Sequence, residues 1–202
     1  MRDTLGGHMR DVVYMASISV DGLIGSANGD SSWAVPDPEL HRHFNELESS
    51  IDAHLYGRRM YELMTEYWPT ADERPSTPDY EVEYARIWKA MPKFVFSNTL
   101  DRVDWNAELV RGDAIREVAR LKRQPGKSMS VGGSVLATSL AQSDLIDEFR
   151  FYVMPTIVGK GTPIFRTLGK HIGVMPVEVR QFSSGAVLLR YRRAGATGSG
   201  AA

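Results

Sequence analysis

The chain has 202 residues, of which 43% are hydrophobic and 24% charged, and its 24 basic side chains almost balance 25 acidic ones. These values are those of one globular domain that can bury a core without a metal or a disulfide. The charge balance argues against a nucleic-acid or membrane partner that is bound through bulk charge. The absence of cysteine excludes thiol catalysis, disulfides and zinc sites built from cysteine.

Neither end of the chain carries a membrane or secretion pattern. No apolar stretch approaches the length of a membrane helix, residues 1–9 lack a hydrophobic signal core, and residues 194–202 are only Gly, Ala, Ser and Thr. We therefore expect a cytoplasmic protein with a single domain over residues 10–193, a flexible N-terminus (1–9) and a flexible tail (194–202).

The first half of the chain alternates between strand-like and helix-like patterns. An apolar run at 11–18 predicts a buried strand, and a loop rich in Gly, Ser and Asn follows it. Asp37 and Pro38 are typical of the N-cap and first position of a helix, whose apolar stripe is Leu40, Phe44, Leu47 and Ile51. Next we expect a strand at 54–57, a helix at 58–66, a helix capped by Thr77 and a strand at 93–97.

The second half continues this alternation and ends differently. Strands are predicted at 108–110, 128–131 and 149–158, with helices at 113–123 and 134–142. Two strand-like runs, 177–182 and 186–192, flank a turn that contains Gly185 and predict an antiparallel hairpin. The fold class is therefore α/β, with a mixed, mainly parallel sheet, helices on both of its faces and a C-terminal antiparallel hairpin. Ligands of such sheets bind beyond the carboxyl ends of the parallel strands.

Three of these strand ends carry residues suited to an anion. Val131-Gly132-Gly133-Ser134 joins a strand to a helix, where backbone N–H groups can face a phosphate. Gly57-Arg58-Arg59 places two guanidinium groups at a helix start, a position that disfavours cations unless they bind an anion. Ser97-Asn98-Thr99 offers hydroxyl and amide groups. Without a ligand, the glycine pair would be a tight turn, the two arginines would be solvated, and Ser97-Asn98-Thr99 would be an ordinary turn.

No metal site is predicted. His41 and His43 lie two positions apart on a helix and so do not share a face. The acidic cluster of Glu46, Glu48 and Asp52 is interpreted as a solvated helix face.

An ordered set of motifs resembles a known fold family. Tyr14 to Gly25, Trp33, Gly57-Arg58-Arg59, Ser97-Asn98 and Gly132-Gly133 are similar in order and spacing to the dihydrofolate reductase fold. The segments 146–155 and 159–165 resemble one branch of it more closely, the reductase domain of the bifunctional riboflavin-biosynthesis deaminase-reductase and its stand-alone relatives. The resemblance covers about residues 11–192 and implies a three-layer fold of the dihydrofolate reductase type.

What the resemblance implies for function is an NADPH-dependent reductase. It would transfer a hydride to a C=N or C=O carbon of a pterin-, pyrimidine- or ribosylamino-type small molecule. The resemblance implies that Ala16, Ile24 and Gly25 line the nicotinamide side, and that Gly57, Arg58 and Arg59 contact the phosphates. It implies that Ser97 and Asn98 contact the 2′-phosphate, and that the pyrophosphate is held by Val131, Gly132, Gly133, Ser134, Val135 and Leu136.

The substrate side is less completely specified. Asp21 is the first candidate for substrate binding or proton relay, with a turn aspartate before Gly22 as the alternative. Folate enzymes place a carboxylate on the first helix, a place that Asp37, Glu39 or His41 could take here. Trp33 and Met154 are candidate pocket walls or core residues, and Lys160 either holds a substrate phosphate or decorates a loop.

Two further expectations concern assembly and the rival function. Val131 stands where riboflavin-pathway reductases usually carry an acidic residue, which favours a non-catalytic nucleotide-binding or assembly module that keeps the reductase fold. A homodimer is expected, because the C-terminal hairpin and the strand at 149–158 can offer an apolar surface.

Overall fold

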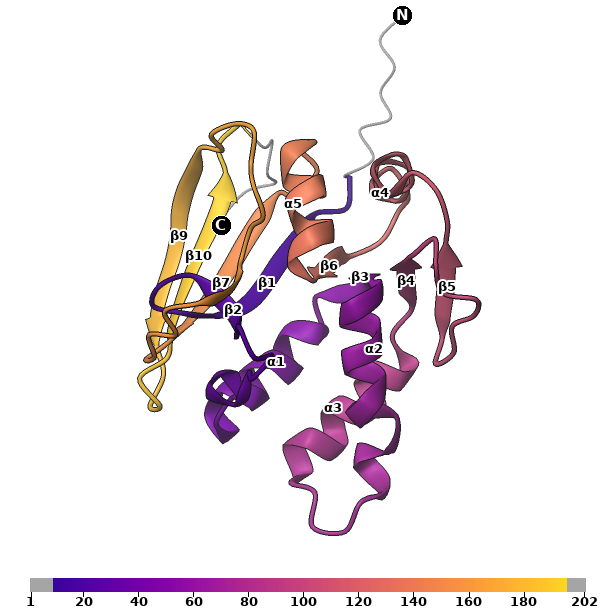
Figure 1. The fold of residues 1–202 in the computed structure, drawn as a ribbon. Coiled ribbons are helices and arrows are strands. Elements are labelled where there is room, and N and C mark those ends of the chain that lie inside the picture. The colour runs from indigo at the N-terminus through magenta and orange to yellow at the C-terminus, as the bar shows by residue number, and fades with distance from the viewer. Residues whose placement is uncertain (1–8, 196–202) are drawn as a thin grey trace, which may run out of the picture.

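The computed structural model describes residues 9–195. These residues fold around one eight-stranded sheet (Figure 1). In spatial order the strands are β5 (Ala107–Val110), β4 (Lys93–Phe96), β3 (Ile51–Gly57), β6 (Ser128–Gly132), β1 (Val12–Ser19), β7 (Glu148–Met154), β10 (Val187–Arg193) and β9 (Val174–Gln181). The pairs from β5 to β7 are parallel, whereas β10 is antiparallel to both β7 and β9. The predicted mixed sheet with its C-terminal hairpin is confirmed.

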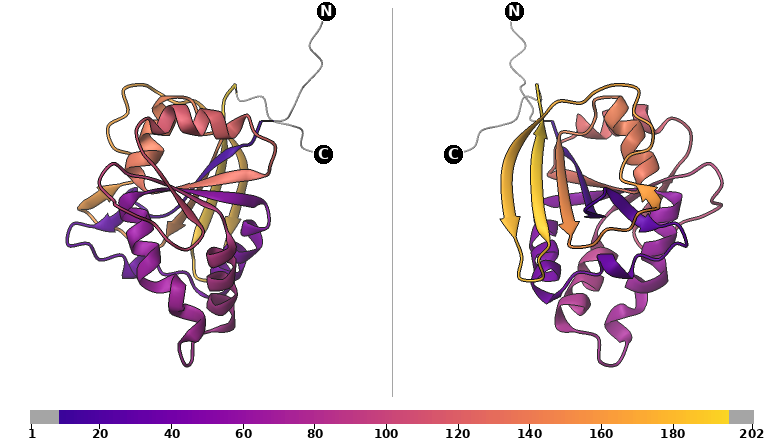
Figure 2. Two further views of the ribbon diagram at one scale, coloured as in Figure 1. Left: turned by 90° about the vertical axis from the view of Figure 1, so that its right-hand side faces the viewer. Right: turned by 60° about the vertical axis from the view of Figure 1, so that its left-hand side comes forward.

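Helices cover both faces of the sheet and complete three layers (Figure 2). On one face, α4 (Ala114–Lys122) and α5 (Ser134–Gln142) bury Leu121 and Leu140 against strand residues such as Leu55. On the other lie α1 (Pro38–Glu48), α2 (Arg58–Tyr67) and α3 (Asp79–Ala90), which contribute Leu40 and Trp88 to separate apolar clusters. Short 3-10 helices, η1 (Ser32–Ala34) and η2 (Trp68–Glu73), connect these elements.

Local signals set most of the element ends. The Asp37 carboxylate accepts a hydrogen bond from the Leu40 N–H and caps α1, and Asp113 caps α4 in the same way. Thr77 does not cap α3, because Pro78 is the N-cap residue and no side chain caps that helix. The strand predicted at 149–158 ends at Met154, since Pro155 has no N–H for the ladder.

A two-stranded sheet that the sequence did not predict lies beside the main one. Its strands are β2 (Leu23–Ser26) and β8 (Gly161–Pro163). Gly161 is required here, because a side chain at this position would overlap the Gly25 carbonyl. The pairing fixes the turn that contains Asp21 against the loop after β7.

The predictions for residues 1–9 and 194–202 lie mostly outside the described residues. Within residues 9–195, no helix has the length and apolarity required to cross a membrane.

Candidate functional site

The three predicted anion-binding turns follow adjacent strands at one edge of the sheet. β3 lies between β4 and β6, and its last residues pair with theirs: Gly57 with Phe96, and Tyr56 with Gly132. The turns at Gly57–Arg59, Ser97–Thr99 and Gly132–Leu136 therefore line the same edge, because all three strands run in the same direction. The structure thus places these three turns at one edge of the sheet.

Contacts between two of the turns hold a guanidinium at this edge. Arg58 donates to the Thr99 hydroxyl at 2.9 Å and to the Glu62 carboxylate at 2.8 Å, while half of its side chain stays exposed. Ser97 accepts from the N–H groups of Thr99 and Leu100, and Asn98 accepts from the Gly112 N–H. Arg58 and the exposed Arg59 therefore place two cations at this edge, beside the exposed Arg111 that follows β5.

The third turn presents backbone rather than side chains. Gly133 adopts a φ of 95°, which a residue with a side chain rarely tolerates. A Cβ at Gly132 would stand 2.9 Å from the Met60 side chain, so both glycines are needed for this crossing. The first N–H groups of α5 have no acceptor within the helix, and its positive end can attract an anion. Val135, in its first turn, is exposed.

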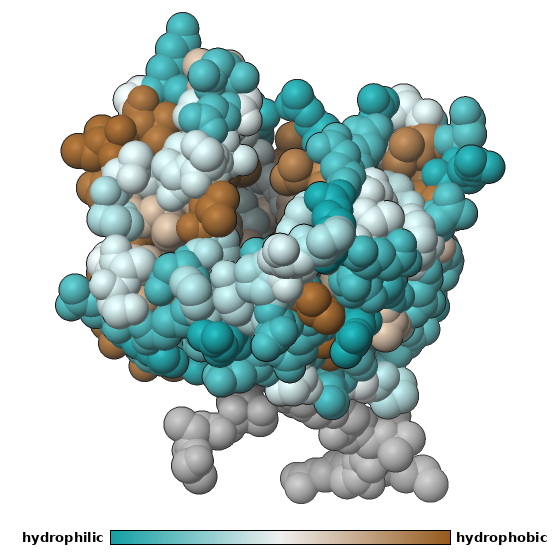
Figure 3. Space-filling view, turned by 90° about the horizontal axis from the view of Figure 1, so that it is seen from below, coloured by the Kyte–Doolittle hydropathy of each residue, from teal (hydrophilic) through white to brown (hydrophobic). Residues whose placement is uncertain are grey.

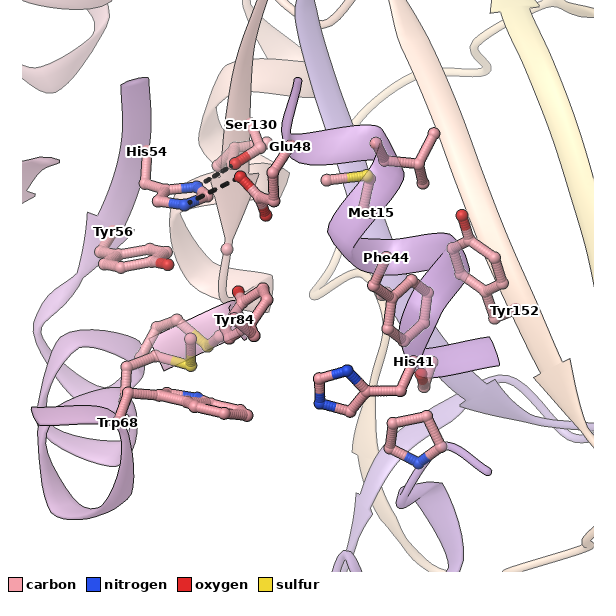
Figure 4. A pocket seen from close by; sticks show the side chains of 18 residues that line it. Met15, His41, Phe44, Glu48, His54, Tyr56, Trp68, Tyr84, Ser130 and Tyr152 are labelled. Atoms are coloured by element: carbon pink, nitrogen blue, oxygen red, sulfur yellow. Dashed lines mark hydrogen bonds and ion pairs between the residues drawn. The ribbon is translucent and has the colours of Figure 1, made fainter. Parts of the chain in front are cut away.

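A cavity of about 310 Å³ lies next to this edge, between α1, α2 and the strands β1, β3 and β6. The surface seen from below is hollowed between two raised lobes, with apolar side chains inside the hollow (Figure 3). Rings form much of the cavity wall, with methionines between them, and Figure 4 shows their arrangement. These residues are Phe44, Tyr56, Trp68, Tyr84, Tyr152, Met15, Met60 and Met64.

Buried polar groups form the inner wall of the cavity. Glu48 is 6% exposed and His54 2% exposed. The Nδ1 atom of His54 lies 2.5 Å from the Ser130 hydroxyl, and its Nε2 atom lies 3.3 Å from Glu48 Oε2 (Figure 4). The second pair is not aligned as a hydrogen bond, and both of its atoms lack a partner within the described chain.

Burial controls the charge of this pair. Desolvation raises the pKa of Glu48 to about 7, although the Lys93 ammonium opposes this shift. Desolvation lowers the pKa of His54 to about 3, so the imidazole is neutral at physiological pH. The two groups are therefore better described as a neutral imidazole beside a carboxyl that titrates near neutrality than as an ion pair.

Lys93 lies close to this wall without lining the cavity. It is 1% exposed, and its ammonium donates to the carbonyls of Trp88, Met91 and Trp105. Burial lowers its pKa to about 8. With three donors and three acceptors, this cation has no donor left for a ligand.

Aromatic side chains surround His41, another residue that lines the cavity. Its ring centroid lies 5.8 Å from that of Trp68 and 5.7 Å from that of Tyr84. Burial lowers the pKa of His41, and its Nδ1 atom has no partner within the described chain.

Of the residues predicted for the cofactor, Ala16, Val131 and Gly132 line the cavity. On the substrate side, only the alternative His41 lines it, and the other predicted residues lie elsewhere. Asp37 caps α1, and Glu39 accepts hydrogen bonds from the N–H and hydroxyl of Ser183. Trp33 and Met154 pack in the apolar cluster under α1, the core alternative, and Lys160 is exposed on the loop before β8. The structure thus does not bring these five to the cavity.

Asp21 makes the contacts of a turn residue. Its carboxylate accepts hydrogen bonds from the Ser19 hydroxyl and from the N–H groups of Val158 and Gly159. These bonds lower the pKa of Asp21 to about 2, the Ser19 bond most strongly. Its role in proton relay stays a prediction, and the contacts are those of the alternative.

Sequence reasoning missed Glu48, His54 and Ser130. The interpretation of Glu48 as part of a solvated acidic face is wrong, because the end of α1 turns this residue inward toward β3. The available signal was the helical stripe of Leu40, Phe44 and Leu47, since Glu48 lies on the same side as Phe44.

Comparison with known proteins gives the family. Residues 10–188 match the family of the RibD C-terminal domain. The chain belongs to the RibD C-terminal domain family. It is 33% identical over 183 residues to the uncharacterized protein YyaP of Bacillus subtilis (strain 168), covering 90% of this chain and 94% of that one. The resemblance drawn from the motifs is confirmed.

Solved structures show the fold that the RibD C-terminal domain family shares. A protein of Shewanella sp. PV-4 whose structure is named for riboflavin biosynthesis is 22% identical, with a TM-score of 0.73 over 91% of this chain and 98% of that one. Dihydrofolate reductase from Enterococcus faecalis, in a complex with NADP(H), is 15% identical, with a TM-score of 0.57 over 91% and 96% of the two chains. At these identities, the likeness to both structures shows a shared fold.

Proposed function

We propose that the protein is an NADPH-dependent reductase that transfers a hydride to a C=N or C=O carbon of a pterin-, pyrimidine- or ribosylamino-type small molecule. The observation that carries this proposal is the position of three anion-binding turns at one sheet edge, directly beside an aromatic-lined cavity. A dinucleotide needs a phosphate cradle and a ring pocket next to one another, and the Enterococcus faecalis neighbour was solved with NADP(H).

The residues present fit the dinucleotide. Gly133 has a backbone conformation that a Cβ would strain, Gly132 packs closely against the Met60 and Tyr56 side chains, and the start of α5 can receive the pyrophosphate. Arg58, beside Ser97 and Thr99, is suited to the 2′-phosphate. NADPH supplies the hydride when bound, whereas the chain binds and orients both rings and excludes water.

Other predicted residues have supporting roles in this proposal. Ile24 and Gly25, on β2, are half-buried, as is Ala16 at the cavity wall, and they would face the nicotinamide side. Asp21 is ionised at neutral pH, so in the reaction it would accept a hydrogen bond or a proton rather than donate one.

Replacing Arg58 and Arg59 together by alanine is expected to weaken NADPH binding by about 100-fold and NADH binding by less than about fivefold. The reason is that a charge-assisted hydrogen bond contributes about 1.5–3 kcal/mol and only NADPH carries the 2′-phosphate. Quenching of tryptophan fluorescence measures both affinities. Arg180→Ala, at an exposed arginine on the edge strand β9, is the control, and equal weakening of the two cofactors would contradict the 2′-phosphate role.

The same binding measurement, combined with an assay of NADPH oxidation, separates the reductase from a non-catalytic nucleotide-binding module. NADPH binding without oxidation across a panel of pterins and pyrimidines would favour the module. If the wild type neither binds the nucleotide nor oxidises it, both the reductase and the nucleotide-binding module are rejected.

We also infer that the protein forms a homodimer through its C-terminal hairpin. β9 is an edge strand that exposes Val177 and Val179, the latter by 70%, and exposed apolar edges are usually covered. We expect Val179→Lys to convert the dimer to a monomer in sedimentation equilibrium at micromolar concentration. Val35→Lys, at an exposed valine before α1, is the matched control. A monomeric wild type would contradict this inference.

A further inference from the structure

One imidazole connects two other polar side chains in the inner wall of the cavity. His54, on β3, lies between Ser130 of β6 and Glu48 of α1 (Figure 4). Its Nδ1 atom lies 2.5 Å from the Ser130 hydroxyl, and its Nε2 atom lies 3.3 Å from Glu48 Oε2. All three residues line the cavity, so the imidazole joins the hydroxyl to the carboxyl along one wall.

The two facing atoms of His54 and Glu48 are each without another partner. Glu48 Oε2 and His54 Nε2 are buried, and neither makes a hydrogen bond to any described residue. Their separation is short enough for a hydrogen bond, but their alignment is not that of one. Because buried polar atoms are rarely left unpaired, we expect a small rotation of the carboxyl to pair these two atoms with each other.

The direction of that bond depends on where the protons lie. Desolvation lowers the pKa of His54 to about 3, so the ring is neutral and carries one N–H, at either Nδ1 or Nε2. When Glu48 is protonated, its O–H can donate to Nε2, and the ring then donates from Nδ1 to the Ser130 hydroxyl. When Glu48 is ionised, Nε2–H donates to the carboxylate and the Ser130 hydroxyl donates to Nδ1. Serine permits both arrangements, because a hydroxyl can donate or accept.

We propose that His54 is a positioning residue that changes its tautomer when Glu48 gains or loses a proton, while the Ser130 hydroxyl reverses its hydrogen bond. Glu48 can then exchange a proton with the cavity, and the facing atoms of all three side chains keep partners in both states. The tautomer change does not require NADPH. Its use in catalysis rests on the proposed function, because reduction of a C=N or C=O carbon takes up one proton with each hydride.

The titratable groups around His54 leave Glu48 as the one that drives the change. Burial raises the pKa of Glu48 to about 7, against the opposing charge of Lys93 on β4. Burial also raises the pKa of Tyr56 on β3 and of Tyr84 on α3 above their ordinary value, so both phenols stay neutral. The pKa of Lys93 is lowered by burial to about 8, so the experiment has to separate its loss of charge from that of Glu48.

Nitrogen-15 NMR of the histidine rings in the wild type, without NADPH, tests this proposal. We expect the ratio of Nδ1–H to Nε2–H in His54 to fall at least tenfold between about pH 5.5 and about pH 8.5. Through-space contacts to the ring of Tyr56, whose plane lies 9° from that of His54, assign the signals. The infrared band of the protonated Glu48 carboxyl should disappear with the same midpoint, near pH 7.

Two glutamine variants show which group drives the ratio. Glu48→Gln has an amide that does not titrate, so its ratio should stay constant over this pH range. Glu46→Gln, at an exposed residue on the same helix, should follow the wild type.

The outcomes separate this inference from the proposed function. A constant ratio in the wild type would overturn the tautomer change, and so would an infrared midpoint more than about one pH unit from that of the ratio. An equal change in a folded Glu48→Gln variant would assign the effect to Lys93 and would overturn it as well. None of these results affects NADPH binding. A wild type that shows the tautomer change but does not bind NADPH would instead reject the reductase and keep the role of His54.

Discussion

Replacement of Lys93 by methionine is expected to lower the free energy of unfolding by about 3–4 kcal/mol. The ammonium is buried and joins three carbonyls from the end of α3, the following turn and the segment before β5. Methionine fills a similar volume but has no donor, so the carbonyls of Trp88, Met91 and Trp105 lose their partner, at a cost of about 1–3 kcal/mol for each one left buried. Urea unfolding measures the difference through the midpoint and slope.

Lys89→Met provides the matched comparison. Lys89 pairs with Asp72 at 2.7 Å in a partly exposed position, where an ion pair contributes less than about 1 kcal/mol. Equal destabilisation by the two substitutions would show that the carbonyls around Lys93 are satisfied in another way.

Glu48→Gln is expected to gain about 2–3 kcal/mol of stability relative to the wild type when the pH rises from 5 to 8. The folded pKa of Glu48, about 7, lies above its ordinary value of 4.5, so folding takes up a proton in between. The contribution of Glu48 to wild-type stability is therefore greatest at low pH and is lost as the pH rises from 4.5 to 7. Glutamine keeps the shape of the neutral carboxyl and does not titrate. Urea unfolding at pH 5 and pH 8 measures the change.

Two features keep this comparison specific. Because the pKa of His54 is lowered, its contribution removes stability as the pH falls below 6.5. This pH dependence has the opposite sign to that of Glu48, and it is the same in the wild type and in Glu48→Gln. Glu46→Gln, exposed on the same helix, should follow the wild type. Parallel stability curves for wild type and Glu48→Gln would mean that the carboxyl is not buried as the structure shows.

The turns at the strand ends could be located from the chain itself. Gly57-Arg58-Arg59 and Val131-Gly132-Gly133 are contiguous, and their glycines, arginines and helix starts carry a local chemical meaning. Strand and helix periodicity also predicted that these turns share one sheet edge, which the order β4-β3-β6 confirms. The cap at Asp37 was equally local.

The inner wall of the cavity could not be located in this way. Glu48, His54 and Ser130 come from α1, β3 and β6, and no local pattern links residues 6 and 76 positions apart. Glu48 was assigned to solvent because its sequence neighbours, Glu46 and Asp52, are polar. Asp37 and Glu39 were expected in the cavity, but they lie near the other end of the helix, where they cap α1 and bind Ser183.

Periodicity, capping and glycine conformation act over a few residues, so the chain alone was enough to predict the alternation of strands and helices, the hairpin and the turns at the strand ends. The buried carboxyl, the lysine that donates to three carbonyls and the position of the aromatic cavity all depend on long-range packing. Burial and desolvation depend on which strands become neighbours, and that neighbourhood is set by packing across the whole domain.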